Sequence, residues 1–578
     1  MPEIYTPIPD DSYLLGRTFY KPTAHGHLWA IALKSKHGFI LTSATSAALA
    51  FIFARIWRLI CSPSDALELQ RPPLCASGVV EKHFSLLRAF LGDFAYAILF
   101  CALACIIYGG GISLSIIAPS RLQLGNVAPV RPSILYYPDP PDDRNDAEML
   151  QWYSLVSAEN LRALGSVDAA KSETRKRVTI TTNKTGYYKD NGTFGLNYTY
   201  SITGVDLGLQ HGNGLLLNVS GSCRTEYDWL VSKTAAEDIY YLWNNETMEQ
   251  RVPIDNLTIL NTPNAIFIKR PEPWLLEPKD TGNTSFAIIV TSAYRASLKP
   301  GSDPWYKTEP LNSTTGTPYS GVSFRIQRGR PVLSCWQHDQ WSYGTRNRTY
   351  VSDVTELGEI PDIKIKPALI HVLRTVFDIP VLVNLGIASG DSALKPGIKS
   401  LDRKADFIDA ETSRIEYDME RLLFASFIKS KNALVDTTMF ESRGPLKNIM
   451  GYSRSEPLPG VGDFVISSSK IQTFSMLGLI VLLVVLLVLL AIEDPETLFM
   501  SNADNDARPI GSGVLALSKA LSASQLFYRI HEPEENRSQK ECKCARRFTE
   551  ASDGQDFGVL EGCSQDELKG QARRPSRV

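Results

Sequence analysis

Long apolar runs without charged side chains are the strongest pattern along this chain. Residues 471–492 form the clearest run, and a helix of that length covers roughly 30 Å, the thickness of a bilayer core. Residues 94–120 form a second uncharged run that is also long enough to span. A third run, 38–54, is shorter, contains four hydroxyl side chains and ends before Arg55. These runs predict an integral membrane protein with about three transmembrane helices.

The N-terminal helix, which contains the run 38–54, has the weakest pattern. We place the three helices at 38–60, 94–120 and 471–492. The first crosses a bilayer core only if the arginine side chains that follow it extend to the interface. The alternative is a helix that lies in the membrane interface. Because the run begins behind a polar stretch and no small-residue cleavage site follows it, we expect no cleavable signal peptide.

Acceptor sequences for N-linked glycosylation, Asn-x-Ser/Thr, cluster in the middle of the chain. The nine predicted glycosylation sites are Asn183, Asn191, Asn197, Asn218, Asn245, Asn256, Asn283, Asn312 and Asn347. One further acceptor sequence, at Asn536, lies elsewhere. A block this dense exceeds what ordinary residue usage gives. It indicates that the middle of the chain lies outside the cytosol.

The apolar runs and the glycosylation sequences together divide the chain into segments. These are a polar N-terminal head (1–37), a first transmembrane helix (38–60), a cytosolic loop (61–93), a second helix (94–120), a glycosylated ectodomain (121–470), a third helix (471–492) and a largely disordered cytosolic tail (493–578). We expect the plasma membrane or the secretory pathway as the location, with the C-terminus in the cytosol. The side of the N-terminus depends on whether the first helix spans, and the basic residues on either side of it are too evenly divided to decide.

Alternating residues indicate strands within the ectodomain. Apolar and polar positions alternate from Phe194 to Ile202, and Asp190-Asn191-Gly192 supplies a turn, so this stretch predicts a β-hairpin. Further short runs of β-branched or aromatic residues begin near positions 214, 265, 285 and 321. Helical patterns cover residues 145–164, 367–377 and 406–428. We therefore expect a large α+β ectodomain with a mainly antiparallel sheet.

Two of the nine cysteines, Cys223 and Cys335, lie in the ectodomain. An even number of cysteines in an oxidising compartment predicts one disulfide. That bond closes a loop of more than a hundred residues, for which loop-closure entropy gives about 4 to 5 kcal/mol of stability.

Sequence signatures of catalysis and metal binding are absent. The ectodomain histidines His211, His338 and His371 accompany no nucleophile elbow, zinc-protease motif or phosphate-binding glycine loop. We therefore expect no enzyme, no cofactor and no metal. The alternative is an ectodomain enzyme that acts on cell-wall glycans, because the paired carboxylates of glycosidases have no fixed spacing in sequence. A formal net charge of −2 without a polybasic segment argues against nucleic acid as a partner.

Two tryptophans lie in the segment SCWQHDQWSYG, residues 334–344. Exposed tryptophans beside polar side chains can stack on sugar rings, which makes a glycan-binding face one interpretation. In the other interpretation, Trp336 packs against the disulfide and Trp341 fills the core. We expect the second arrangement, because large aromatic side chains are mostly buried.

Three sequence features carry a resemblance to known proteins. They are PVLSCW (Pro331 to Trp336), SCRTEYDW (Ser222 to Trp229) and a helical pattern over residues 514–530. With these features and its order of helices, the chain resembles uncharacterised multipass membrane glycoproteins of filamentous ascomycete fungi. The resemblance implies a cell-surface or secretory-pathway protein and supplies no activity. We expect non-enzymatic sensing, adhesion or scaffolding, with the lipid bilayer and a cell-wall glycan or a protein ligand as partners.

Overall fold

The computed structural model divides the chain into two units, residues 1–493 and 494–578. The predicted tail, including Asn536, lies outside the described residues. The described residues are 10–68, 102, 106, 109–141, 146–183, 187–188, 191–254, 264–271, 283–291, 295–311, 323–344, 348–389, 393–394, 398–402, 405–440, 446–452 and 456–493.

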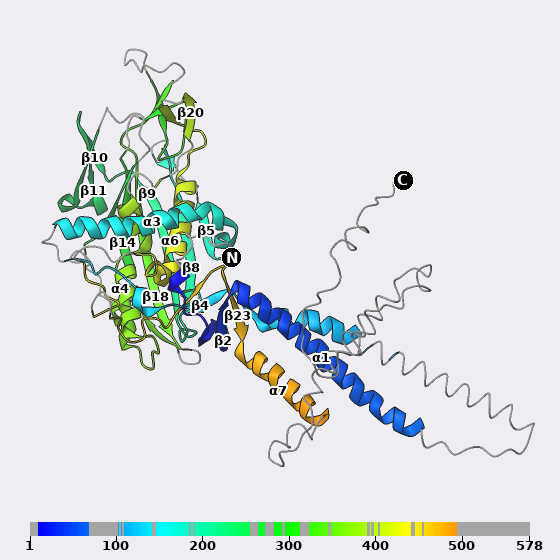
Figure 1. Ribbon diagram of the computed structural model, residues 1–578. Coiled ribbons are helices and arrows are strands. Elements are labelled where there is room, and N and C mark those ends of the chain that lie inside the picture. Colours follow the sequence, from blue (N-terminus) through cyan, green and yellow to red (C-terminus); the bar gives the residue numbers. More distant parts are fainter. Residues whose placement is uncertain are drawn as a thin grey trace, which may run out of the picture. The chain divides into compact units, whose positions relative to one another are not determined.

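A seven-stranded antiparallel sheet forms the centre of the ectodomain (Figure 1). Its strands follow the order β13-β14-β18-β9-β8-β5, and β19 pairs with the C-terminal part of β18. The strands are β5 (Val178–Asn183), β8 (Gly195–Thr203), β9 (Leu216–Glu226), β13 (Ala265–Lys269), β14 (Asn283–Val290), β18 (Val332–Tyr343) and β19 (Thr349–Val351). The strands predicted near 214, 265 and 285 are confirmed. The run that begins near 321 forms two strands, β17 (Phe324–Ile326) and β18.

Alternation along β8 gives the sheet an inner and an outer face. Tyr198 and Tyr200 are buried on the inner face, whereas Asn197 and Thr199 are exposed on the outer face. β5 and β8 pair antiparallel along their length, so the predicted hairpin is confirmed. This alternation follows from the two-residue period of a strand.

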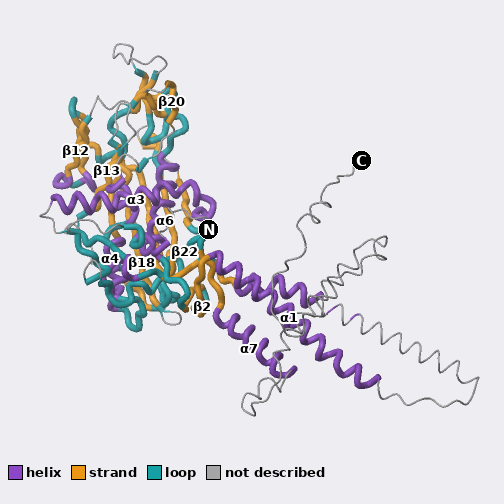
Figure 2. Tube along the Cα trace, in the orientation of Figure 1, coloured by secondary structure: helices purple, strands orange, loops and turns teal. Residues whose placement is uncertain are grey.

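Four helices pack against the inner face (Figure 2). They are α3 (Asp146–Arg175), α4 (Pro367–Phe377), α5 (Val381–Ser389) and α6 (Ile415–Asp436). Tyr200 lies edge-on to Phe427 of α6 with ring centroids 5.9 Å apart, and Trp341 lies edge-on to Phe377 of α4 at 5.2 Å. These ring pairs join the helices to the sheet.

The three predicted ectodomain helices are present, but two of them have different ends from those predicted. α4 has its predicted bounds, while α3 continues past residue 164 to Arg175. The helix predicted from residue 406 begins at Ile415, because residues 405–408 form the strand β21 instead. Helix α5 was not predicted from the sequence.

Smaller sheets complete the ectodomain, among them a two-stranded sheet of β4 (Val127–Pro129) and β22 (Val465–Ser467). β10 (Leu230–Lys233), β11 (Glu237–Tyr241) and β12 (Glu249–Pro253) cover one end of the outer face and bury Trp229, Tyr240 and Val332. A five-stranded sheet has the order β16-β17-β15-β21-β20, with one parallel pair between β15 and β21. Its further strands are β15 (Ala296–Ser297), β16 (Thr308–Pro310), β20 (Ile398–Asp402) and β21 (Ala405–Ile408). The fold is therefore mixed α+β with mainly antiparallel sheets.

A four-stranded sheet joins the N-terminal residues to the end of the ectodomain. Its strands are β1 (Thr18–Thr23), β2 (Gly26–Lys34), β23 (Ile471–Ser475) and β3 (Gln123–Gly125), in that spatial order. β2 and β23 pair antiparallel from Ala30 opposite Ser475 to Lys34 opposite Ile471. The prediction that a transmembrane helix begins at residue 471 is therefore wrong, because residues 471–475 are the last strand of this sheet. Residues 18–23 and 26–34 of the predicted polar head belong to the same sheet.

Three helical segments connect to this four-stranded sheet. α1 (Ser35–Glu68) follows β2, residues 109–122 precede β3, and α7 (Met476–Glu493) follows β23. α1 and α7 lie side by side (Figure 1). Gly38 of α1 packs so closely on the Gln472 side chain of β23 that a Cβ atom there would collide with it. The sheet is thus the point at which these helices meet the ectodomain.

The three predicted transmembrane helices are confirmed only in part. Within the described residues, one helix, Ser35–Ile56, is by itself long and apolar enough to cross a membrane, a property that a signal sequence shares. α4 and α5 together pass the same test with a 65° bend, but their apolar side chains are buried in the ectodomain core. The apolar helix Met476–Leu490 is shorter. Of the predicted second helix, 94–120, the described residues 109–120 are helical, and most of the residues before 109 lie outside the described part of the chain.

Candidate functional site

A cleft of about 830 Å³ separates the N-terminal hairpin β1–β2 from helix α4. One wall is formed by side chains of the hairpin and of the loop around His211, and the other by the segment that leads into α4. The hairpin turn depends on Gly26, whose φ of 145° favours glycine. The cleft therefore joins parts of the chain that lie far apart in sequence.

Three rings form the hairpin side of the cleft. Tyr20 and His27 have ring centroids 4.9 Å apart, and His211 lies 5.7 Å from Tyr20 and 6.0 Å from His27. The backbone N–H of Tyr20 donates to Oε1 of Gln210 at 3.3 Å, which ties the hairpin to this loop. The rings give this wall both apolar faces and imidazole nitrogens for hydrogen bonding.

Cationic side chains line the opposite wall. Lys364, Lys366 and Arg374 face one carboxylate, that of Asp463, so positive charge is in excess. No ion pair of either lysine is formed with another described residue. The stem of Lys366 lies over Gly460, whose φ of 78° also favours glycine. Such a surface attracts anions.

The backbone of the same wall adds to its positive electrostatic potential. Lys366 precedes the first turn of α4 and offers it no side-chain hydrogen bond. Pro367 has no N–H, and the N–H of Leu369 donates to the carbonyl of Lys366 at 3.0 Å, which leaves the N–H of Ala368 without a partner among the described residues. Unpaired N–H groups at a helix N-terminus favour negative charge. The Oη atom of Tyr343 accepts the backbone N–H of Lys364 at 3.1 Å and fixes the approach to the helix. Arg374 is held at the other end of the wall by donating to the carbonyl of Thr355.

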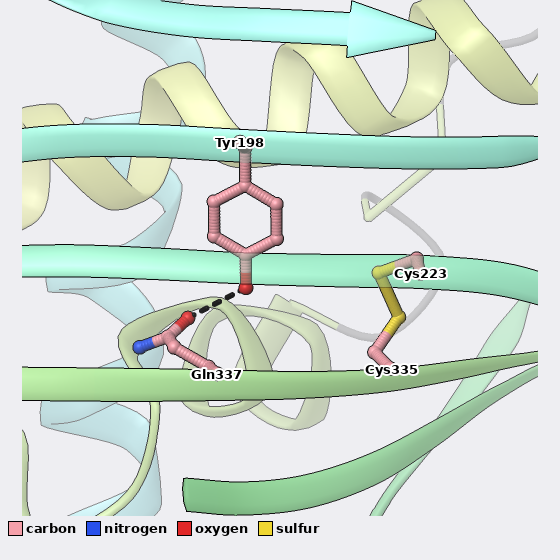
Figure 3. Close-up of a disulfide and its surroundings, with 4 residues drawn as sticks. All are labelled: Tyr198, Cys223, Cys335 and Gln337. Atoms are coloured by element: carbon pink, nitrogen blue, oxygen red, sulfur yellow. Dashed lines mark hydrogen bonds between the residues drawn. A yellow bond between two sulfur atoms is a disulfide. The ribbon is translucent and has the colours of Figure 1, made fainter. Parts of the chain in front are cut away.

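The predicted disulfide joins Cys223 of β9 to Cys335 of β18 (Figure 3). The two residues are direct cross-strand partners on the inner face, with Cα atoms 4.1 Å apart. Beside them, Oη of Tyr198 donates to Oε1 of Gln337 at 2.9 Å, and Nε2 of Gln337 donates to Asp339 at 2.8 Å. The disulfide prediction is confirmed, and the bond lies in the sheet rather than in the cleft.

Buried polar groups beside the disulfide have shifted ionisation. Burial raises the pKa of Tyr198 well above its usual range. Burial also raises the pKa of the Asp339 carboxyl to about 6, against the opposing effects of the Gln337 amide and the charge of His338. A carboxyl with this pKa changes charge in mildly acidic solution.

The two tryptophans of the 334–344 segment lie on opposite faces of the sheet. Trp341 is 1% exposed and fills the core, as predicted. Trp336 is 43% exposed on the outer face, so the prediction that it packs against the disulfide is wrong. The two-residue period explains this, because a buried Cys335 turns its neighbour in sequence outward.

The predicted glycosylation sites are exposed at four positions. Asn183, Asn197, Asn218 and Asn283 have exposed side chains, and Asn245 is half-buried. The remaining sites of the predicted set are Asn191, whose side chain is not described, and Asn256, Asn312 and Asn347, which lie outside the described residues. Exposure leaves these four acceptors open to modification.

A buried ionic network between α3 and α6 was not predicted. Nζ of Lys429 lies 3.5 Å from the carboxylate of Glu159 and donates to Oδ1 of Asn160 at 2.5 Å. Nη2 of Arg162 lies 2.9 Å from Oδ1 of Asp436. Burial raises the pKa of Asp436 well above its usual range; the Glu159 charge raises it further, while Arg162 opposes both.

This network is not a substrate site. Glu159 and Asp436 are fully buried, and neither carboxylate lines the cleft. The sequence did carry a signal for it, since Lys429 follows Leu422 by seven residues and so falls on the buried stripe of the helix.

The described residues contain no group of three or more His, Cys, Asp or Glu side chains that could hold a metal ion. Of the three ectodomain histidines, His211 lines the cleft, while His338 lies on the outer face of the sheet and His371 is exposed on α4. These histidines are therefore not brought together.

Comparison with known proteins identifies one family. A domain of unknown function (DUF8406) matches residues 157–466, which is more than half of the chain. No curated protein and no solved structure matches. The matched region contains the seven-stranded sheet and the cationic wall of the cleft, but not the N-terminal hairpin or the apolar helices.

Proposed function

We propose that this chain is a non-enzymatic membrane glycoprotein that senses a ligand outside the cytosol. The chain belongs to the family of the domain of unknown function DUF8406. The ligand site is the cleft between the N-terminal hairpin and α4. The membrane anchors are α1, the segment that ends at residue 122, and α7. The N-terminal apolar helix and the disulfide are in keeping with the secretory pathway or with membrane anchoring.

The observation that carries this proposal is the four-stranded sheet. Hydrogen-bonded strands lie on one side of a membrane, so β1 and β2 share a side with β3 and β23. Between Lys34 and Gln123 the chain must then cross the membrane an even number of times. With α1 as one crossing, the helical residues 109–122 supply the return, and α7 supplies a third crossing. This supports an N-terminus on the ectodomain side.

Exposed apolar side chains support lipid as the partner of these helices. Across the described residues, large exposed apolar side chains concentrate on α1, on residues 109–122 and on α7. Examples are Phe39 at 65%, Ile116 at 70% and Leu477 at 66% exposed. Contiguous exposed apolar surface of this kind is typical of a membrane contact. α7 has 18 residues and covers about 27 Å, near the short end of what can span.

The position of the cleft supports sensing rather than passive adhesion. Tyr20 and His27 belong to the hairpin whose second strand continues directly into α1. Lys364 and Lys366 belong to the ectodomain wall. A ligand that fills the cleft contacts both walls, so its binding energy acts on the hairpin that continues into a membrane helix. The excess of positive charge favours a ligand that carries a carboxylate or a phosphate.

Protease protection in sealed microsomes tests the membrane arrangement. Full-length protein carries one epitope at the N-terminus and another at the C-terminus. We expect added protease to remove the C-terminal epitope and to leave the N-terminal epitope intact, together with an ectodomain that shifts in mass on deglycosylation. Digestion of the N-terminal epitope in intact vesicles would contradict the proposed arrangement.

Thermal unfolding of the detergent-solubilised full-length protein tests the cleft, with inorganic phosphate as the probe. We expect phosphate to raise the unfolding midpoint by mass action and the double variant Lys364→Gln/Lys366→Gln to lose this rise. Lys447→Gln is the matched control, because Lys447 is exposed and does not line the cleft. An equal rise in the double variant, or none in the unmodified protein, would contradict an anion site.

A further inference from the structure

Three glycosylation sequences lie within strands of the seven-stranded sheet and share its outer face. In an Asn-x-Ser/Thr sequence within a strand, the asparagine and the hydroxyl residue point to the same side, because side chains alternate with a period of two. This holds for Asn197 on β8, Asn218 on β9 and Asn283 on β14. All three asparagines are exposed.

Trp336 lies on this same face among small polar side chains. Its direct cross-strand partners are Ser285 of β14 on one side and Ser222 of β9 on the other. Serines leave the faces of the indole uncovered, in agreement with its 43% exposure. Among the described residues, the Trp336 side chain has no hydrogen bond and no ring contact. A large apolar ring therefore stays 43% exposed on a polar face.

Asn283 is the nearest of the three acceptors to this ring. It pairs directly with His338, so Asn283 and Trp336 are diagonal cross-strand neighbours, about 7–8 Å apart and within reach of an aromatic side chain. Asn197 lies two strands from Trp336, through Ser222, which is roughly 10 Å at the usual strand spacing. Asn218 pairs with Gln340, four residues along β18 from Trp336.

We infer that the first sugar of an N-linked glycan on Asn283 stacks on the indole ring of Trp336. One face of an N-acetylglucosamine ring presents C–H groups, and an indole ring offers a large flat apolar surface that gains by their contact. His338 lies directly opposite Asn283 on the neighbouring strand. The glycan then becomes part of the packed structure of the sheet.

This inference rests on the proposed location outside the cytosol, since only there is the glycan added. A mutant cycle on the full-length glycosylated protein tests it, with the thermal unfolding midpoint as the measurement. We expect Trp336→Ala and Asn283→Gln each to lower the midpoint, and the double variant to lower it no further than either single change. The control is Asn218→Gln, from the same face, whose effect adds to that of Trp336→Ala. Trp336→Phe keeps an aromatic face and retains most of the coupling.

Trimming the glycan sharpens the test. An endoglycosidase that leaves the first sugar on Asn283 is expected to preserve the effect of Trp336→Ala, and an amidase that removes the whole glycan is expected to abolish it. Additive effects of Trp336→Ala and Asn283→Gln overturn the stacking, as does a glycopeptide spectrum with Asn283 unmodified. If glycans occupy Asn197 and Asn218 while the coupling is absent, only this inference fails. If every acceptor is unmodified, the proposed membrane arrangement fails with it.

Discussion

The seven-stranded sheet and the α3–α6 helix pair are both buried, but they are held together by different chemistry. On the inner face of the sheet, aromatic side chains such as Tyr200 and Trp341 pack around a cross-strand disulfide. Between the helices, Lys429 and Arg162 lie against Glu159 and Asp436. The apolar face gains free energy from every contact made on folding, whereas the ionic network first loses the hydration of four charges. The helix pair should therefore be far more sensitive to the loss of one side chain.

Removing the central ammonium of the network is expected to have the largest effect. Lys429→Ala leaves the Glu159 carboxylate buried without a counter-charge and should lower the free energy of unfolding by about 4 kcal/mol. Denaturant titration of the detergent-solubilised protein measures this. The double variant Lys429→Met/Glu159→Gln removes both charges and should recover most of the loss. If the double variant is as unstable as the single one, packing rather than charge holds the helices together.

Removing the disulfide is expected to rank second. The variant Cys223→Ala/Cys335→Ala frees a loop that spans 112 positions in sequence and should cost about 3 kcal/mol, less than the loop-closure value of about 4 to 5 kcal/mol because the unfolded chain keeps residual structure. The same titration, repeated on unmodified protein with a reductant, should give a similar loss. A stability that is insensitive to both treatments would show that cross-strand pairing alone keeps β9 and β18 together.

The pH dependence of stability should separate the two regions further. The pKa of Asp339 in the folded protein is about 6, above the value of 3.8 for the free side chain. The folded state therefore binds the Asp339 proton more tightly than the unfolded state does. The stabilisation from this proton is fully present below about pH 4 and is lost as the pH rises through about 6. Asp339→Asn should flatten the stability profile over this range by about 3 kcal/mol. A variant profile parallel to that of the unmodified protein would contradict the raised pKa.

The exposed end of the same helix pair should give the smallest effect. Glu420 of α6 pairs with Lys171 and Arg175 of α3 where both basic side chains are half-exposed or more. Glu420→Gln should therefore cost less than about 1 kcal/mol. A cost that matches that of Lys429→Ala would show that burial does not set the strength of these ion pairs.

The sequence predicts best where a pattern is local. Strict alternation located β8, a short run of strand-forming residues located β9, and the two ectodomain cysteines were enough to predict their bond. The outward position of Trp336 also follows from a local rule. Side chains alternate along a strand, so a buried Cys335 requires its neighbour to point outward. Lys429 could not be interpreted from its own helix. A lysine on a buried helix face is stable only when a residue distant in sequence supplies the opposite charge.

The cleft and the four-stranded sheet could not be predicted in this way. The cleft is formed by Tyr20 and His27 at one end of the chain and by Lys364 and Lys366 in the ectodomain. Each segment reads as an ordinary strand or loop, and only the tertiary fold brings them together. Residues 471–475 were predicted as membrane helix because they are uncharged and adjoin an apolar run, and an uncharged segment can equally form a buried strand.

The pairing of β2 with β23 also dictates an order of assembly during synthesis. The hairpin leaves the ribosome more than four hundred residues before its partner strand. Throughout that interval, one side of β2 presents unpaired backbone N–H and C=O groups, which are a template for pairing with other chains. A truncation before residue 471 removes the strand that covers this edge and should therefore favour aggregation.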